Sequence, residues 1–279
     1  MAPLATLSEA PQTSAKVKSR LGRQRPSRLQ VVEVSKTYEG AGGQTVVALE
    51  RTSFTVPSGG ITALLGPSGC GKSSLLRIVA GLTRPTSGHV ELDRRRIDGP
   101  GRDRGMVFQS YTSFPWLTVR RNVEYGLKLA GTPPAHRRER ALDFLTLVHL
   151  EKFADVYPSQ LSGGMRQRVA LARAMAPERK ILLLDEPFGA LDYETRWQMQ
   201  DLLLEIVGKT GLTVLLVTHD IEEALYLAEK VIVLKPHPGR IADVIYPDFR
   251  REDHGNKETL VVSERFIHWQ KHLLNGMRH

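Results

Sequence analysis

Hydrophobic positions along the chain follow two periods, which divide it into strands and helices. Continuous apolar runs at residues 61–65, 181–184 and 213–218 have the length and composition of parallel strands that are buried on both faces. Shorter or alternating patterns predict further strands at residues 29–34, 46–49, 53–56, 89–92 and 105–108. Polar or glycine-rich turns divide the first three of these, with Tyr38 at the first turn. The pattern predicts a small, mostly antiparallel β-region in front of an α/β core with a parallel sheet.

From residue 111 to about residue 173 the hydrophobic period is that of amphipathic helices. Two apolar faces occur there, the first marked by Val119, Val123 and Leu127 and the second by Ala141, Leu142, Leu145 and Val148. A Gly-Thr-Pro-Pro break at residues 131–134 separates them. Because strands are predicted on either side, this stretch is interpreted as a helical subdomain inserted in the α/β core.

Residues 246–279 are predicted to form a partly helical C-terminal extension. They begin with polar and charged residues and end with an apolar stripe at helical spacing, formed by Phe266, Ile267, Trp269, Leu273 and Leu274. Such a stripe more often packs on its own protein than it serves as a binding surface, and packing is the interpretation favoured here.

The composition is that of a globular protein. Of 279 residues, 41% are hydrophobic and 25% are charged. The longest apolar runs fall far short of the roughly 20 residues that a membrane-spanning helix needs, so we expect none. Cys70 is the only cysteine, which excludes an intrachain disulfide and a cysteine-based metal site.

The net charge of +9 suggests nucleic-acid binding at first, but much of it comes from one end. Six basic residues stand against Glu9 within residues 1–28, namely Lys16, Lys18, Arg20, Arg23, Arg25 and Arg28. A disordered, solvated tail is the favoured interpretation of this segment. Attraction to anionic lipid and an organelle transit peptide are the alternatives.

The strongest chemical signal is a phosphate-binding loop. Residues 66–73 read Gly66, Pro67, Ser68, Gly69, Cys70, Gly71, Lys72 and Ser73, which fits the pattern G-x-x-x-x-G-K-[ST]. The predicted strand 61–65 leads into the loop, and a predicted helix at residues 74–80 leaves it. Glycines allow backbone N–H groups to turn toward phosphate oxygens at a helix N-terminus. Lys72 is then expected on the β- and γ-phosphates and Ser73 on Mg²⁺.

Three further features follow the predicted strands or open a helix. Asp185 and Glu186 end the apolar run 181–184, where one carboxylate can hold Mg²⁺ and the other can orient the attacking water. Gln109 and His219 end two other strands; alone, each would be read as an ordinary hydrogen-bonded residue. Ser162, Gly163 and Gly164 open a helix and form a second anion-binding N-terminus. Since one subunit already has a phosphate loop, this second cradle is expected to serve a partner's nucleotide.

With these motifs in this order, the sequence closely resembles the nucleotide-binding subunits of ATP-binding cassette (ABC) transporters over about residues 29–244. The resemblance implies a P-loop NTPase of the ABC ATPase class, with an ABC domain at residues 29–245. It also implies the following roles. Tyr38 would stack on adenine, the loop from Gly66 to Ser73 with Ser74 would hold the nucleotide, and Leu161 to Gly164 would be the signature motif. Gln109 would contact Mg²⁺ and water, Asp185 would bind Mg²⁺, and Glu186 would be the catalytic glutamate. Asp192 would lie in the D-loop at the dimer interface, and His219 would contact the γ-phosphate.

What the family implies about function is an ATPase subunit of an importer. It would bind MgATP between two subunits of a head-to-tail homodimer or heterodimer and drive integral-membrane permease subunits. An extracytoplasmic solute-binding protein would be an indirect partner, and no nucleic acid is expected. The place implied is peripheral, on the cytoplasmic side of the inner membrane.

Three short segments resemble the nitrate, sulfonate and taurine branch of importers, which indicates uptake of a small anion. They are residues 161–168, 114–119 and 238–241. Met165 departs from the glutamine that many family members carry there, and a thioether cannot make the hydrogen bonds of an amide. The alternative function is a non-transport ABC-type ATPase that acts on nucleic acid or ribosomes. Against it, the sequence has neither sustained heptads for a long coiled coil nor a second cassette.

Overall fold

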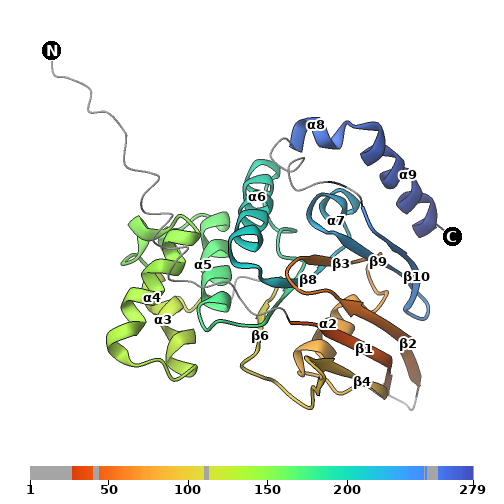
Figure 1. Cartoon of the computed structure of the whole chain (residues 1–279), viewed down its shortest axis with the longest axis horizontal. Coiled ribbons are helices and arrows are strands. Elements are labelled where there is room, and N and C mark those ends of the chain that lie inside the picture. Colours follow the sequence, from red (N-terminus) through yellow and green to blue (C-terminus); the bar gives the residue numbers. More distant parts are fainter. Residues whose placement is uncertain (1–26, 40–43, 110–112, 248, 250–256, 279) are drawn as a thin grey trace.

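The computed structural model describes residues 27–39, 44–109, 113–247, 249 and 257–278. Two sheets with helices around them make up this part of the chain (Figure 1). The expectations for the basic tail at residues 1–28 fall almost wholly outside the described residues, as does the start of the expected helical subdomain at residues 111 and 112.

The first sheet is antiparallel, as the opening pattern predicts. Its order is β2 (Thr45–Val56), β1 (Leu29–Glu39), β4 (Ser87–Leu92) and β5 (Arg95–Arg96). Two details of the prediction are wrong. Residues 46–49 and 53–56 belong to one strand, and Tyr38 lies within β1, paired with Val46, instead of at a turn. Glu50 and Arg51 are exposed on this strand. A register shift places both of them opposite Ser35 alone, so β2 continues through them and pairs with β1 on either side.

The second sheet is the predicted parallel core. Its order is β10 (Arg240–Ile245), β9 (Lys230–Lys235), β3 (Ile61–Leu65), β8 (Thr213–Thr218), β7 (Ile181–Asp185) and β6 (Arg104–Val107). All neighbours are parallel except β10, which pairs antiparallel with β9. The carboxyl ends of β3, β6, β7 and β8 therefore lie at one edge of the sheet.

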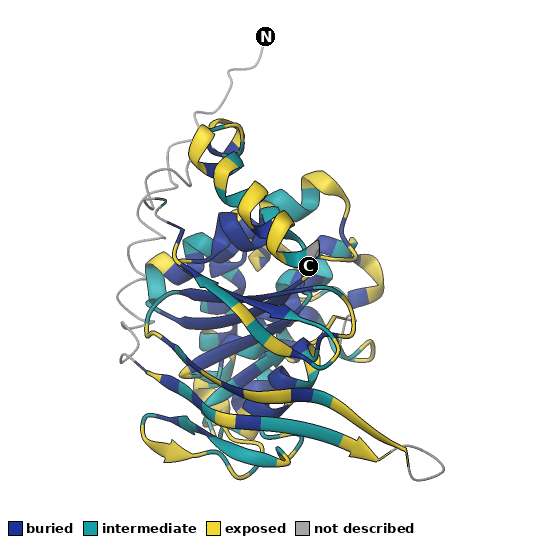
Figure 2. Ribbon diagram, turned by 90° about the vertical axis from the view of Figure 1, so that its right-hand side faces the viewer, coloured by how far each residue is buried: buried dark blue, intermediate teal, exposed yellow. Residues whose placement is uncertain are grey.

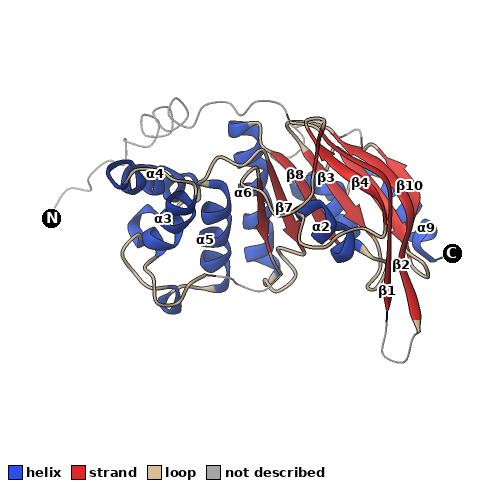
Figure 3. Cartoon of the chain, turned by 90° about the horizontal axis from the view of Figure 1, so that it is seen from below, coloured by secondary structure: helices blue, strands red, loops and turns tan. Residues whose placement is uncertain are grey.

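Two groups of helices connect the strands. Beside the sheet lie α2 (Lys72–Ala80), α6 (Tyr193–Thr210) and α7 (Ile221–Leu227). The crossover from β6 to its neighbour β7 contains α3 (Val119–Leu129), α4 (Pro134–Leu147), η2 (Glu151–Phe153), η3 (Pro158–Gln160) and α5 (Gly163–Met175). Figure 3 shows α3, α4 and α5 gathered at the end of the molecule opposite β1 and β2. The helices are thus an insertion between adjacent strands, while the domain boundaries stay a prediction.

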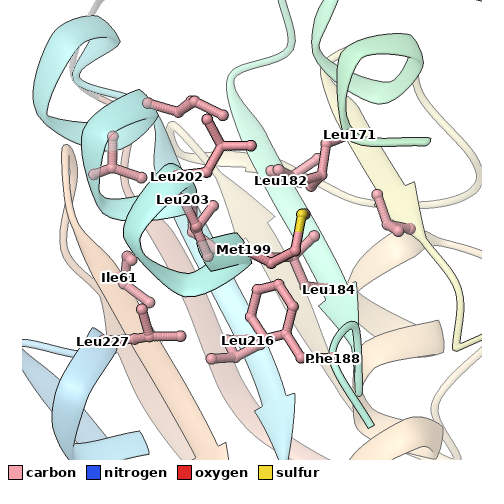
Figure 4. Close-up of a cluster of buried hydrophobic side chains, with 14 of the residues drawn as sticks. Ile61, Leu171, Leu182, Leu184, Phe188, Met199, Leu202, Leu203, Leu216 and Leu227 are labelled. Carbon is pink, nitrogen blue, oxygen red and sulfur yellow. The ribbon is translucent and has the colours of Figure 1, made fainter. Parts of the chain in front are cut away.

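The core fills both faces of the parallel sheet, because successive side chains of a strand point to opposite sides. On β7, Leu182 and Leu184 join the cluster under α5, α6 and α7, and Ile181 and Leu183 join the cluster that faces α2 and the first sheet. Figure 4 shows part of the first cluster around Phe188 and Met199. The central strands are accordingly buried along their length (Figure 2). These strands give the site a rigid base.

The C-terminal extension contains α8 (Lys257–Val261) and α9 (Glu264–Arg278), which lie against α7 (Figure 1). Phe266 and Leu273 are each 1% exposed and belong to the main core, and Trp269 packs on it. Leu274 is 40% exposed, so the predicted stripe is buried only on the side that faces the protein. No helix in the described part of the chain is long and apolar enough to cross a bilayer.

Candidate functional site

The predicted phosphate loop connects β3 to α2 through backbone conformations that suit glycine. Gly69 has φ of 81° and Gly71, the N-cap of α2, has φ of 90°. A Cβ atom on Gly71 would come within 2.7 Å of the Ala48 carbonyl oxygen. Side chains are thus excluded both by the backbone angles and by the neighbouring strand, and the N–H groups at the start of α2 remain accessible.

Lys72 lies inside this loop. Its ammonium donates to the carbonyl oxygens of Gly66 at 2.6 Å and Pro67 at 2.9 Å, and the residue is 5% exposed. Cys70 is also buried there, and burial raises the pKa of its thiol. A thiol that stays protonated is a poor nucleophile, so Cys70 serves as packing and not as a reactive group.

Tyr38 stands beside the start of α2, although it comes from β1. Its hydroxyl donates to Ser74 Oγ at 3.1 Å, the residue is 39% exposed, and the Lys36 ammonium lies 4.8 Å from the ring centre. An aromatic ring next to the phosphate loop with an open face can stack on a planar base. Stacking of Tyr38 on adenine stays a prediction.

Ser73 and Asp185 meet where α2 starts and β7 ends. The Ser73 hydroxyl donates to Asp185 Oδ1 at 3.1 Å. Burial raises the pKa of Asp185, the Ser73 hydrogen bond opposes that rise, and the charge of Glu186 adds to it. A partly desolvated carboxylate beside a hydroxyl is a hard oxygen donor set, which suits Mg²⁺ when phosphate oxygens complete the shell. The described residues contain no cluster of three His, Cys, Asp or Glu side chains that could hold a metal ion.

Glu186 joins the ends of three strands. Its Oε2 accepts from Gln109 Nε2 at 3.3 Å and lies 3.2 Å from His219 Nδ1. Its backbone N–H donates to the Val217 carbonyl oxygen, and its φ of 45° lies in the left-handed region. The strand ends after β6, β7 and β8 thus bring together three predicted residues that are far apart in sequence. This geometry gives Glu186 a fixed carboxylate oxygen between an amide and an imidazole.

Ser162, Gly163 and Gly164 lie at the start of α5. Ser162 is exposed, and its Oγ accepts from the Met165 backbone N–H at 3.3 Å as an N-cap. Met165 packs against the main core, so its side chain has a structural place there. Within the described residues, no hydrogen bond or ion pair links this N-terminus to the phosphate loop, and Figure 3 shows α5 on the far side of α6 from α2.

Asp192 caps the next helix and is likewise exposed. Its Oδ1 accepts from the Thr195 backbone N–H at 2.9 Å, which lowers the pKa of its carboxyl. The structure therefore gathers Tyr38, the loop, Asp185, Glu186, Gln109 and His219 at one edge. It leaves Ser162 and Asp192 exposed, Gly163 partly exposed, and Gly164 buried against α6.

The sequence pattern assigns no role in the site to two residues near this edge, although Gly239 lies in the segment 238–241. Gly239, in the turn between β9 and β10, donates its N–H to the Ala48 carbonyl, and a Cβ there would meet the Cys70 carbonyl oxygen at 2.3 Å. Arg196 on α6 donates to the Leu191 carbonyl at 3.0 Å and lies 3.9 Å from the Asp220 carboxylate. The available signals were a glycine in a Pro-Gly turn and an arginine one helical turn after Asp192.

Comparison with known proteins places the chain in a family. A profile of the family described as ABC transporter matches residues 49–189, and the chain belongs to this family. Among its relatives, the nitrate import ATP-binding protein NrtD of Synechocystis sp. is 47% identical over 213 residues, which cover 76% of this chain and 80% of NrtD. The taurine import ATP-binding protein TauB of Rhizobium johnstonii is 47% identical over 240 residues, which cover 85% of this chain and 92% of TauB.

A solved structure supports the same assignment. The dimeric ATP-binding cassette MJ0796, in a post-hydrolysis state with ADP and phosphate, has a TM-score of 0.69 and 36% identity to this chain. The match covers 80% of this chain and all of that one. The predicted fold class, the ABC ATPase activity and the resemblance to nitrate and taurine import subunits are thereby confirmed.

Proposed function

We propose that the chain is the ATP-hydrolysing subunit of an ABC importer that takes up a small anion, and that it works as a head-to-tail dimer. The observation that carries the proposal is the contact of one Glu186 oxygen with both Gln109 and His219 beside the phosphate loop. A carboxylate fixed in this way can orient or deprotonate the water that attacks the γ-phosphate.

The other predicted residues divide the remaining tasks. Lys72 and the loop N–H groups hold the phosphates, and Tyr38 with Ser74 borders the base. Ser73, Asp185 and Gln109 would hold Mg²⁺, which neutralises charge that develops on the phosphate oxygens. His219 lies 3.2 Å from Glu186, and its imidazole can donate a hydrogen bond to a γ-phosphate oxygen when nucleotide is bound.

The dimer is supported by the two outward-facing helix N-termini. Ser162 and its glycines offer N–H donors and a hydroxyl that the chain's own loop does not use. A second copy, related head to tail, can bring its phosphate loop to this N-terminus and complete a pocket that one copy leaves half built. The dimeric form of the MJ0796 cassette agrees with such a pairing.

The names of the relatives support the importer role and an anionic cargo, and exposed side chains of the insertion support a membrane partner. NrtD is named for nitrate import and TauB for taurine import, so we place this chain in the same chemical class of cargo. The insertion after Gln109 carries several exposed aromatic and apolar side chains, namely Trp116, Tyr125, Leu129 and Tyr157. A surface of this kind suits a permease partner, which would hold the subunit at the cytoplasmic side of the membrane.

The experiment that tests the proposed chemistry is steady-state ATP hydrolysis by the purified chain and by Glu186→Gln. We expect the variant to bind ATP as the native chain does and to turn it over at least ~100-fold more slowly, because the amide cannot accept a proton. Glu151→Gln, an exposed site on η2, is the matched control and should leave turnover unchanged. Equal turnover in Glu186→Gln and the native chain would remove Glu186 from this role.

Co-purification tests the physiological partner. Recovery of the chain with a membrane permease from detergent-solubilised membranes supports an importer. Recovery with ribosomes or nucleic acid instead would favour the non-transport ATPase.

A further inference from the structure

Lys257 is a buried cation that belongs to the C-terminal extension. Its side chain is only 5% exposed. Its ammonium donates to Gln200 Oε1 and lies 4.3 Å from the ring centres of both Trp197 and Tyr226. A carboxylate oxygen of Glu222 lies 3.8 Å away. Buried ammonium groups are retained only where such partners offset their desolvation, so these contacts fix the lysine in one position.

The partners of Lys257 come from two helices. Trp197 and Gln200 lie on α6, and Glu222 and Tyr226 lie on α7. The first residue of the short helix α8 thus lies in the seam between α6 and α7. Figure 1 shows α8 close to both helices. The Tyr226 hydroxyl also donates to Asp201 of α6 at 2.5 Å, which is a direct hydrogen bond between the two helices beside the lysine.

Both helices start at residues of the proposed site. Asp192 is the N-cap of α6, five positions before Trp197. Asp220, which follows His219 directly, is the N-cap of α7, two positions before Glu222. Rotation or sliding of either helix would therefore move Asp192 or His219 relative to Glu186.

A second set of contacts links the N-terminal turns of α6 and α7. Arg196 reaches from α6 to both the Leu191 carbonyl and the Asp220 carboxylate. Thr218 accepts from the Asp220 backbone N–H and donates to the buried Glu223 carboxyl. The turn that bears His219 is thus held on one side by α6 and on the other by the first residues of α7.

We infer that Lys257 is a positioning residue for ATP hydrolysis, because it locks α6 to α7 and thereby keeps His219 and Asp192 in place at the site. This inference rests on the proposed function, since it assumes that His219 takes part in the reaction. It makes the C-terminal extension part of the hydrolytic machinery, although the described part of the extension packs on α7 and β9 and makes no hydrogen bond to the phosphate loop.

The test is the steady-state kinetics of Lys257→Met in the full-length chain. Methionine keeps the length and the apolar stem of the side chain and removes the charge and its hydrogen bond. We expect kcat to fall about 5- to 10-fold and KM for ATP to stay within about twofold of the native value. The nucleotide is held by β1, the loop and α2, which Lys257 does not contact, so a lowered kcat at constant KM reports a misplaced catalytic group.

Lys230→Met is the matched control. Lys230 is likewise buried at 6% exposure, donates to the Thr55 carbonyl at 2.8 Å and lies 5.7 Å from the Tyr246 ring centre. It sits beyond the C-terminal end of α7, away from His219. This variant also removes a buried ammonium group and its hydrogen bond, so it controls for a general loss of stability. We expect it to keep kcat within about twofold of the native value.

The outcomes separate the inference from the proposed function. If the native chain hydrolyses ATP and Lys257→Met does so with kcat within twofold of native, or if both lysine variants lose kcat equally, the inference is wrong and the proposed function stands. If the native chain has no ATPase activity, both are wrong. If Lys257→Met does not fold, Glu222→Gln is the deciding variant, because Glu222 is partly exposed and its replacement weakens the same contact between α6, α7 and Lys257. We expect its kcat to fall about two- to threefold. An unchanged kcat overturns the inference.

Discussion

Lys72 donates to two carbonyl groups of its own loop, so its ammonium already sits where phosphate oxygens would accept from it. Replacement by alanine removes the only side-chain cation in the loop, together with its hydrogen bonds to the Gly66 and Pro67 carbonyl oxygens. We expect Lys72→Ala to weaken ATP binding at least ~10-fold, as the loss of a charge-assisted hydrogen bond does. Titration with ATP checks this, and a native affinity would show that the loop N–H groups alone suffice.

Glu223 gives a second prediction at this scale, for stability. Burial, together with the charge of Asp220, raises the pKa of Glu223 to about 8, while the Thr218 hydrogen bond and the charges of Arg196 and Lys257 oppose the rise. In the unfolded chain the carboxyl ionises near its usual pKa of about 4.3. Between these two values the native state binds a proton that the unfolded state has lost, so the free energy of unfolding falls as pH rises from about 5 to 8.

Glu223→Gln should remove this fall, because an amide stays neutral at every pH. Urea unfolding at pH 5 and at pH 8 should then differ less than in the native chain, by a margin on the order of 4 kcal/mol. The exposed Glu258→Gln on α8 serves as the control and should leave the pH dependence as it is. Identical pH dependence in native protein and Glu223→Gln would mean that the carboxyl ionises normally inside the fold.

The residues that could be predicted are those whose chemistry fixes their type and spacing. The loop needs glycines and one lysine, and it stands out in the sequence for that reason. Gln109, Glu186 and His219 could be placed because each follows an apolar run, and parallel strands end at one edge of a sheet. Lys257 could not, because its partners are 31 to 60 positions away and lie on helices whose mutual packing no local pattern specifies.

At the scale of elements, contact between α5 and α6 depends on a missing side chain. A Cβ atom on Gly164 would lie 2.4 Å from Thr195 Cγ2, which is far inside contact distance. Gly164→Ala gains less than about 1 kcal/mol in helix propensity, whereas overpacking costs about 1–3 kcal/mol, so we expect a net loss of about 1–2 kcal/mol in the free energy of unfolding. Urea unfolding measures it.

A compensating change identifies the cause of that loss. Thr195→Ser removes the clashing methyl group and keeps the hydroxyl, so the double variant Gly164→Ala with Thr195→Ser should recover at least half of the lost stability. If the two substitutions lower the free energy of unfolding additively in the double variant, the loss in Gly164→Ala does not come from a clash with Thr195 on α6.

Elements were predictable where hydrophobic runs are long and uniform, and less so where polar residues interrupt a strand. β3, β7 and β8 start and end within one residue of their apolar runs, since burial on both faces admits only apolar side chains. The sequence pattern predicts two strands in place of β2, because Glu50 and Arg51 look like a turn. An edge strand with one solvated face can carry them, and only pairing with β1 reveals that the strand continues.

At the scale of the whole molecule, the proposed site is complete only in a dimer, and mixing two inactive variants tests this. Lys72→Ala damages the loop half of a site, and Ser162→Phe damages the half that the partner supplies. In a mixed head-to-tail dimer both defects fall in the same site, and the other site is intact. ATPase activity should therefore rise above that of either variant, to about a quarter of native at equal amounts, since random pairing makes half of the dimers mixed and each holds one intact site of two.

The matched control pairs Lys72→Ala with Glu186→Gln. Both residues lie on the loop half of a site, in contact with β3, β7 and β8, so the mixed dimer carries one defect in each of its two sites. No rescue is expected, although subunit exchange, protein concentration and buffer are the same as in the first mixture. Rescue in the first pair and not in the second requires that Ser162 act on the nucleotide of another copy, because any arrangement in which a chain completes its own site makes the two mixtures equally inactive. Activity in neither mixture, with exchange verified by labelled subunits, would argue against a shared site.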